Sequence, residues 1–202
     1  MKTEDKALLL HICCGPCAEY PLKVLREEGF GKIKGYFFNP NIQPPGEMKR
    51  RRESVERFAR LHDLDLMVND RCDEAVWRAF ASDKKSRHCR YCYHLRFNEA
   101  ARMTRELGYD AFTSTLFVSP WQDQEAMTKA AEAAAERHGV EYLPRDFRSG
   151  YRKGQQMARE DGLYRQRFCG CIYSLGETKF KDKILKELGL RPEDVPPRQS
   201  EA

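Results

Sequence analysis

The sequence predicts an α/β protein built on a mostly parallel sheet of four or five strands flanked by helices. Short apolar runs of strand length alternate along the chain with longer segments whose apolar residues recur at helical spacing. Glycines and prolines separate many of these segments. Strands that alternate with helices pair in parallel, and we expect the connections to be right-handed.

The first strand is expected at 7–12, where an apolar run ends at Gly15-Pro16. The amphipathic helix that follows runs from about 17 to 28 and ends at Gly29. A second apolar run predicts a strand at 33–38. The three prolines of 39–46 end this strand, because proline lacks the amide hydrogen that regular structure uses. A loop this stiff at a strand end is expected to shape a site.

The next apolar stripe predicts a helix over about 47–62, with basic residues on its opposite face. Leucine and valine alternate with polar residues at 64–68, which is the period of a short, half-exposed strand. Apolar residues at helical spacing predict a helix over 73–81 and a longer one from 84 to about 107.

A fourth strand is expected at 112–118, followed by a helix that begins at Ser119 and ends at Gly139. Ser119, Pro120 and Gln122 are residue types that favour the first turn of a helix. The remaining expected elements are a strand at 140–143, a loop at 146–152, a short helix at 155–161 and a helix at about 174–188. We expect one α/β domain over 1–190, acting as a metal-binding catalytic domain, and a disordered tail over 191–202.

No run in the 202 residues approaches the roughly 18 apolar residues of a membrane span. The charged residues 1–6 lead into an apolar run that is too short for a signal peptide. We therefore expect a cytoplasmic protein with no membrane partner. Thiols stay reduced in that compartment, so the eight cysteines are expected to be ligands or catalysts rather than disulfides.

Positive charge is gathered around the cysteines. The net charge is +5, and the stretches 49–60, 84–105 and 145–167 carry local charges of +4, +6 and +4. Such a distribution predicts a polyanionic partner, either RNA or a phosphate-bearing substrate. Ordinary solvated helix faces would produce the same runs, and this alternative stays open.

Seven of the eight cysteines fall into three short motifs, which are Cys13-Cys14-Gly15-Pro16-Cys17, Cys89-x-x-Cys92 and Cys169-Gly170-Cys171. The first motif follows the first strand, at the sheet edge where open α/β sheets bind ligands. A helix amino terminus there favours thiolate. Adjacent Cys13 and Cys14 cannot both direct their sulfurs, with Cys17, at one small ion, so the later pairs are expected to join the site. Cys72 stands apart and is interpreted as a packed core residue.

Three kinds of thiol chemistry are compatible with these motifs. Cys14-Gly15-Pro16-Cys17 has the spacing of a thioredoxin-like active site, which would make the protein a CxxC thiol–disulfide oxidoreductase. The two later pairs could hold a structural zinc ion in a zinc-stabilised RNA-binding module. An iron–sulfur cluster would take four thiolates and leave up to three for a second metal or for redox work. No standard ferredoxin spacing is present, so spacing alone leaves the cluster type open.

Six motifs spread over about 7–175 together resemble the QueH type of epoxyqueuosine reductase. They are His11-x-Cys13-Cys14-Gly15-Pro16-Cys17, Asn39-Pro40-Asn41-Ile42, Arg87-x-Cys89-x-x-Cys92-Tyr93, Ser114-Thr115-Leu116 with Ser119-Pro120, Asp146-Phe147-Arg148, and Tyr164-Arg165-Gln166-x-x-Cys169-Gly170-Cys171. One departure is Arg167-Phe168 before Cys169, where a single tyrosine-rich stretch is expected.

The resemblance implies a HUP-type, Rossmann-like α/β sandwich and the last step of queuosine synthesis. In that step the epoxide oxygen of epoxyqueuosine, at the wobble position of the tRNA anticodon, is removed by two electrons and two protons. The resemblance also implies a [4Fe–4S] cluster, a nearby mononuclear metal ion that is iron, an external electron donor, and no cobalamin. Related sulfur-transfer enzymes bind ATP through a Ser-Gly-Gly loop. Here Cys13-Cys14-Gly15-Pro16 takes that place, so no ATP is expected.

Within this resemblance, the cluster ligands are expected to be mainly Cys89, Cys92, Cys169 and Cys171. Cys13 and Cys14, with Cys17, would be shared between the cluster and the second metal. The candidate catalytic residues are Cys13, Cys14, Asp146 and Tyr151. Five arginines are expected to contact phosphates of the anticodon arm: Arg87, Arg90, Arg148, Arg152 and Arg165. Trp121 could stack on a flipped-out base.

Overall fold

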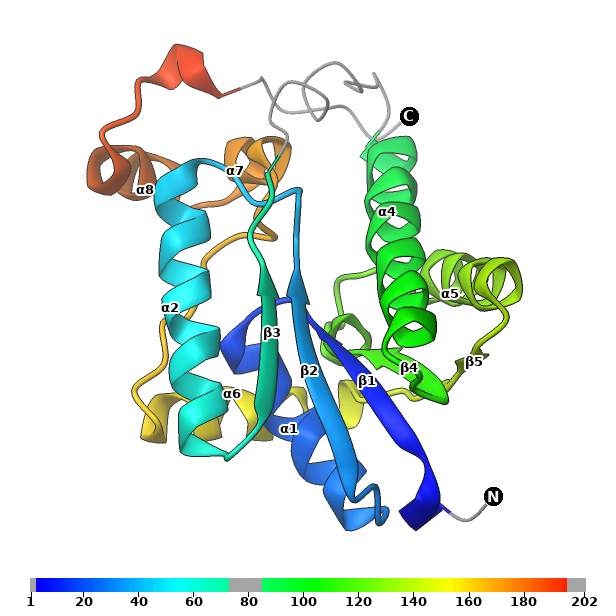
Figure 1. Ribbon diagram of the computed structural model, residues 1–202. Coiled ribbons are helices and arrows are strands. Elements are labelled where there is room, and N and C mark those ends of the chain that lie inside the picture. Colours follow the sequence, from blue (N-terminus) through cyan, green and yellow to red (C-terminus); the bar gives the residue numbers. More distant parts are fainter. Residues whose placement is uncertain (1–2, 73–84, 196–202) are drawn as a thin grey trace.

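Five parallel strands form one sheet in the order β3-β2-β1-β4-β5, so the predicted α/β class is confirmed. Their bounds are Ala7–Ile12 for β1, Lys32–Phe38 for β2, Asp65–Asn69 for β3, Ala111–Ser114 for β4 and Glu141–Tyr142 for β5. This computed structural model describes residues 3–72 and 85–195 (Figure 1). The helix expected at 73–81 lies outside the described residues.

The central strand β1 is buried along its whole length, with β2 on one side and β4 on the other. A strand covered on both faces of the sheet has no solvent-facing positions, which is why its sequence is a continuous apolar run rather than an alternating one. In register, Leu10 of β1 lies beside Gly35 of β2 and Thr113 of β4.

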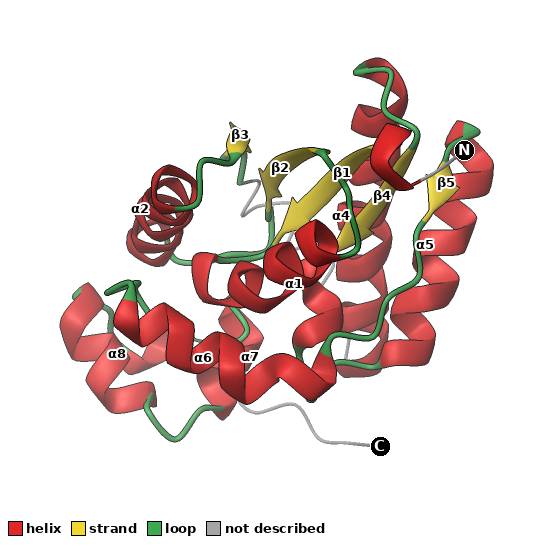
Figure 2. Ribbon diagram, turned by 90° about the horizontal axis from the view of Figure 1, so that it is seen from below, coloured by secondary structure: helices red, strands yellow, loops and turns green. Residues whose placement is uncertain are grey.

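The α-helices of the described residues flank the sheet: α1 (Gly15–Glu27), α2 (Pro45–Leu61), α4 (Lys85–Glu106), α5 (Gln124–His138), α6 (Tyr151–Glu160), α7 (Ile172–Glu177) and α8 (Lys181–Leu188). Helix α1 packs against α2 and α6, and α4 packs against α5. Figure 2 shows α1 lying between the sheet and α6. Within the described residues, no helix is long and apolar enough to span a bilayer.

Two clusters of buried side chains result from this packing. The larger one joins the strands to α1, α2, α4 and α5. The smaller one joins α7, α8 and the beginning of α4, and includes Phe168 and Tyr173. Figure 1 shows α7 near the carboxyl ends of the strands, beside the beginning of α2. The last helices therefore bring the third cysteine motif back to the sheet edge where the first one lies.

The segment after β4 differs from the sequence prediction. The strand expected at 112–118 ends at Ser114, whose Oγ accepts a hydrogen bond from the Leu116 amide and begins a 3-10 turn over Thr115–Val118. The helix expected to start at Ser119 begins at Gln124 instead. Its cap is Asp123, whose carboxylate accepts a hydrogen bond from the Ala126 amide at 3.0 Å.

Three further boundaries also differ. The helix expected at 155–161 begins at Tyr151, directly after a 3-10 turn over Arg148–Gly150. The helix expected at 174–188 is divided into α7 and α8 at Thr178, whose Oγ1 donates to the Arg167 carbonyl and leaves the helical ladder. Within the expected tail, Pro192–Asp194 form a 3-10 turn and Val195 is buried, while 196–202 lie outside the described residues.

Candidate metal centre

The first cysteine motif lies where the strand order reverses. From β1 the chain moves to β2 and β3 on one side, and it later returns to place β4 on the other side. Loops that leave neighbouring strands in opposite directions open a crevice at their carboxyl ends. Cys13 and Cys14 follow β1 at this point, and Thr115 follows β4. The Cys13 amide donates a hydrogen bond to Thr115 Oγ1 at 3.0 Å, which joins the two loops.

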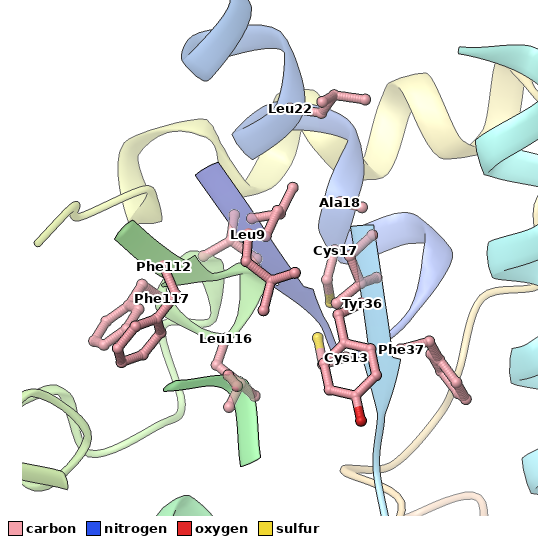
Figure 3. Close-up of a cluster of buried hydrophobic side chains, with 14 of the residues drawn as sticks. Leu9, Cys13, Cys17, Ala18, Leu22, Tyr36, Phe37, Phe112, Leu116 and Phe117 are labelled. Carbon is pink, nitrogen blue, oxygen red and sulfur yellow. The ribbon is translucent and has the colours of Figure 1, made fainter. Parts of the chain in front are cut away.

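The first thiol group consists of Cys13, Cys14 and Cys17, which are all buried. Their sulfurs lie within 4.8 Å of one another, and those of Cys13 and Cys14 are 3.8 Å apart. Figure 3 shows the sulfurs of Cys13 and Cys17 pointing toward one another from the end of β1 and the first turn of α1. All three sulfurs are thus gathered at one helix amino terminus, close enough together to hold one ion. The expectation that adjacent Cys13 and Cys14 cannot, with Cys17, direct their sulfurs at one small ion is therefore wrong, because the turn into α1 brings the two neighbouring side chains to the same side.

The three thiols differ in charge preference. Hydrogen bonds from Cys14 and Cys17, with the nearby Arg96 charge and a hydrogen bond from Thr115 Oγ1 at 3.2 Å, hold the pKa of Cys13 well below its usual range. Burial and the neighbouring Cys13 raise the pKa of Cys14. The hydrogen-bonded Cys13 and Cys14 sulfurs raise the pKa of Cys17. The group therefore holds one thiolate readily and needs a cation to hold more.

The second thiol group consists of Cys89, Cys92, Cys169 and Cys171, from the beginning of α4 and the loop before α7. Burial, and then the charge of Cys169, raises the pKa of Cys171 to about 12. Burial also raises the pKa of Cys92 to about 11, and Cys169 again adds to the shift. Cys169 therefore acts electrostatically on both Cys92 and Cys171.

A buried arginine faces both thiol groups. Arg96 is 3% exposed, its Nη1 lies 3.7 Å from the Cys92 sulfur, and it donates to the Asn39 side-chain carbonyl. Its charge helps to lower the pKa of Cys13, and it opposes the burial that raises the pKa of Cys92. Within the described residues, no carboxylate pairs with Arg96, and its Nε has no hydrogen-bond partner. A buried guanidinium needs an anion, and the thiols are the anions available to it.

A second buried arginine holds the third cysteine motif in place. Arg51 pairs with the buried Glu47 at 2.7 Å and donates to the carbonyls of Phe168 and Cys169 at 2.8 and 2.9 Å. Gly170 passes so close to Arg51 that a Cβ there would lie 2.9 Å from its Nη1, and its φ is +123°. Glycine is therefore required at this position of the motif.

Side-chain amides and an imidazole complete the surroundings. Gln166 Nε2 donates to the Cys14 sulfur at 2.8 Å and lies 3.5 Å from the Cys17 sulfur. The Oε1 of Gln166 is buried and has no hydrogen-bond partner among the described residues. Burial, with the Arg96 charge, lowers the pKa of His11 to about 3, so the ring is neutral. His11 Nε2 donates to the Phe38 carbonyl, and Nδ1 accepts from Ser114 Oγ at 2.7 Å. His11 thus ties β1 to both neighbouring strands.

The expected catalytic residues outside the thiols lie in different surroundings. Tyr151 is half-buried at the beginning of α6, and burial, with the nearby Cys17 charge, raises its pKa. It also meets the Trp121 ring edge-on at 4.9 Å between centroids, and Trp121 is 74% exposed. Asp146 is exposed and pairs with Arg148 at 2.6 Å. Tyr151 is therefore electrostatically coupled to the first thiol group, whereas Asp146 is paired with Arg148.

The expected RNA-contacting arginines are exposed where their side chains are described. Arg90, Arg148, Arg152 and Arg165 are all exposed, and Arg165 Nε donates a hydrogen bond to Gln155 Oε1. The side chain of Arg87 lies outside the described part of the chain. Cys72, interpreted as a core residue, is in fact exposed, and its sulfur lies 3.5 Å from the carbonyls of Pro40 and Ile42.

Sequence reasoning missed the two buried arginines and Gln166. Arg51 and Arg96 each add one positive charge to a basic stretch, as a surface arginine would, and no local sequence pattern indicates that they are buried. Gln166 stands inside a motif, three residues before Cys169, which is the one signal that could have identified it. A set of seven thiols with buried positive charge and unsatisfied polar atoms is chemically suited to thiophilic metals.

Comparisons with known proteins agree with this site. The family model described as "Epoxyqueuosine reductase QueH" matches residues 8–177. The epoxyqueuosine reductase QueH of Dehalococcoides mccartyi is 34% identical over 167 residues, which cover 83% of this chain and 91% of that protein. The QueH of Thermotoga maritima is 31% identical over 183 residues, covering 86% and 93%.

Among solved structures, the predicted subunit of tRNA methyltransferase from Methanocaldococcus jannaschii is similar, with a TM-score of 0.46 and 15% identity. The alignment covers 96% of this chain and 100% of that one. The family model and the curated relatives each match most of the chain, and the residues matched by the family model include all three cysteine motifs. The chain belongs to the QueH family of epoxyqueuosine reductases.

Proposed function

We propose that this protein reduces epoxyqueuosine in tRNA to queuosine, using a [4Fe–4S] cluster and an adjacent mononuclear iron held by its cysteines. The overall change is loss of the epoxide oxygen as water, with two electrons and two protons consumed and an alkene formed. The observation that carries this proposal is the convergence of two thiol groups on Arg96, a buried cation with no carboxylate partner in the described structure. Family membership supplies the reaction.

The donor set fits the proposed metals. Cys89, Cys92, Cys169 and Cys171 would supply most of the cluster ligands, and Cys13, Cys14 and Cys17 would be shared between the cluster and the iron. When bound, the cluster supplies single electrons and the iron a Lewis acid for the departing oxygen. The buried, unpartnered atoms Arg96 Nε and Gln166 Oε1 support an occupant in this space.

The remaining residues would position the ligands and move protons. Thr115 and Gln166 hold the sulfurs of Cys13 and Cys14 by hydrogen bonds, which fixes their rotamers. Tyr151, with a raised pKa, is protonated at neutral pH and lies near the thiols, so it is the proposed proton donor. Hydrogen bonds from Arg148 lower the pKa of Asp146, so this carboxylate is suited to binding or orienting the substrate rather than to donating a proton.

The proposed tRNA-binding surface surrounds the exposed side of the site. Arg90, Arg152 and Arg165 would contact phosphates, since they form no ion pair within the described residues. Trp121 would stack on a base that leaves the anticodon stack, because the Trp121 ring is exposed and is held in place by an edge-on contact with the Tyr151 ring. An external electron donor is also required.

The test is anaerobic purification, followed by iron, zinc and sulfide analysis and by mass spectrometry of tRNA after incubation with a reductant. We expect more iron than sulfide and conversion of epoxyqueuosine to queuosine. Cys89→Ser should lose iron and activity, whereas the matched control Cys72→Ser should keep both.

Two outcomes would contradict the proposal. A colourless protein that holds zinc after anaerobic reconstitution with iron and sulfide would indicate a zinc-stabilised RNA-binding module. Activity that needs Cys14 and Cys17 but no metal would indicate a thiol–disulfide oxidoreductase.

A further inference from the structure

Three metal-ligating side chains converge outside the thiol groups, where the ends of α2 and α6 meet α1. Glu19 lies in α1, His62 follows the last residue of α2 and Asp161 follows the last residue of α6. One ligand atom of each lies within 4.8 Å of the others. His62 Nε2 is 2.8 Å from Asp161 Oδ2 and 3.2 Å from Glu19 Oε2.

The hydrogen bonds of this cluster are incomplete. A single imidazole nitrogen carries at most one proton, so Nε2 cannot donate to both carboxylates. Its hydrogen bond goes to Asp161, and both carboxylate oxygens of Glu19 are buried and accept no hydrogen bond within the described part of the chain. The Glu19 side chain is 0% exposed. Burial, with the nearby Asp161, raises the pKa of Glu19 to about 8, so at neutral pH Glu19 holds a proton that a bound cation would displace.

Nearby positive groups of the described structure do not supply that cation. Arg57 donates to the backbone carbonyl of Asp161, and Arg26 donates to the backbone carbonyls of His62 and Asp63. The exposed Glu160, next to Asp161, adds further negative charge. The cluster is therefore rich in anionic ligand atoms and short of positive charge.

We propose that Glu19, His62 and Asp161 bind a divalent cation, separate from the thiol metals. Ligands at about 2.1 Å in octahedral geometry lie about 3 Å from their neighbours, and the two distances at His62 Nε2 are 2.8 and 3.2 Å. Two carboxylates and one imidazole suit Mn²⁺ or Fe²⁺ better than soft ions, which prefer thiolates.

The cluster is open to solvent on one side. The side chains of His62 and Asp161 are 27% and 29% exposed, so an ion can enter and water can complete its coordination. A cation here would link α1, α2 and α6 at one point. Since α1 begins at the first thiol group, this link would brace the helix that carries Cys17.

The test is a Mn²⁺ titration of the anaerobically purified, iron-loaded protein, followed by the electron paramagnetic resonance signal of free Mn²⁺. Mn²⁺ is the probe because thiolates compete poorly for it. We expect one saturable site in the wild type. Glu19→Gln and Asp161→Asn should each weaken binding by more than about tenfold. Glu160→Gln, which removes an adjacent exposed carboxylate, should bind Mn²⁺ as the wild type does.

Thermal unfolding gives a second readout that does not depend on activity. Mn²⁺ should raise the Tm of the wild type and of Glu160→Gln, but not that of Asp161→Asn. Asp161→Asn serves as the test variant if Glu19→Gln fails to fold, because the partly exposed Asp161 side chain can be replaced at lower cost than the buried Glu19 side chain. If the wild type bound Mn²⁺ without saturation and to the same extent as Asp161→Asn, the proposal would be overturned. The three side chains would then be interpreted as an internal ion-pair cluster. Iron and sulfide content, measured in the same samples, reports on the thiol groups separately.

Discussion

Arg96 Nη1 lies 3.7 Å from the Cys92 sulfur, and the same guanidinium lowers the pKa of Cys13. One buried cation therefore acts on a thiol that follows β1 and on another in α4. Asn39 orients this guanidinium, since its side-chain carbonyl accepts from Arg96 Nη2 while its amide donates to the Ile12 carbonyl at 2.9 Å. The loop after β2 thus links the end of β1 to Arg96.

Arg96→Met should make the reduction potential of the iron-loaded protein more negative, because loss of a buried positive charge disfavours adding an electron nearby. Arg96→Lys keeps the charge and should shift the potential less. Potentiometric titration followed by electron paramagnetic resonance measures both, with iron content as the check on loading. Equal potentials for Arg96→Met and the wild type at full iron content would contradict the role assigned to Arg96.

Glu47→Gln should destabilise the metal-free protein by about 3–5 kcal/mol, because it leaves the buried Arg51 without its carboxylate. Urea unfolding under anaerobic conditions measures the change. The matched control is Glu53→Gln in the same helix, which removes an exposed partner of Lys49 and should cost less than about 1 kcal/mol. Similar losses for both variants would mean that the Glu47–Arg51 pair does not support the 168–171 loop.

Gly150→Ala should destabilise the protein by about 1–3 kcal/mol. A Cβ at this position would lie 2.0 Å from the Tyr20 ring, so α6 and Tyr151 would have to move away from α1. Gly31→Ala is the control, because the nearest atom to its Cβ is 3.8 Å away. Urea unfolding compares the stabilities of the two variants. Equal denaturation midpoints would show that Tyr20 moves aside for the added Cβ at position 150 without a loss of stability.

The Asp146–Arg148 pair should make a small, pH-dependent contribution to stability. Hydrogen bonds from Arg148 lower the pKa of Asp146 in the folded protein, so the contribution is present above the unfolded pKa and is lost as pH falls through the folded pKa. Both side chains are about half exposed, so we expect less than about 1 kcal/mol at pH 7. Comparing Asp146→Asn with the wild type by urea unfolding at pH 7 and pH 3 tests this. A larger difference at pH 3 than at pH 7 would contradict the sign.

Local pattern was sufficient for the elements whose burial is nearly uniform along their length. The expected strand at 7–12 has the bounds of β1, and the expected strand at 33–38 differs from β2 by one residue. Apolar runs ended by glycine and proline carry this information, because the whole segment is in one environment.

The segment after β4 shows where local pattern fails. Ser119-Pro120 has the residue types of a helix start, yet no helix begins there. Instead, Ser114 caps a 3-10 turn earlier in the chain, and the Phe117 carbonyl in this turn accepts a hydrogen bond from the Phe147 amide at 3.2 Å. A partner 30 residues away holds this segment, so short-range propensity has less influence on it than tertiary contact.

The sequence by itself determined the fold class, the seven clustered thiols as the candidate site and, through its motifs, the family. These properties depend on residue type, spacing and order, which are features of the amino-acid sequence and do not require the folded structure. Only the tertiary structure decided which basic residues are buried and what they face. Arg96 and Arg90 stand in one basic stretch, yet Arg96 lies between the thiol groups and Arg90 is exposed. The difference arises because burial depends on the packing of α4 against the sheet and α7, which no local pattern of charge encodes.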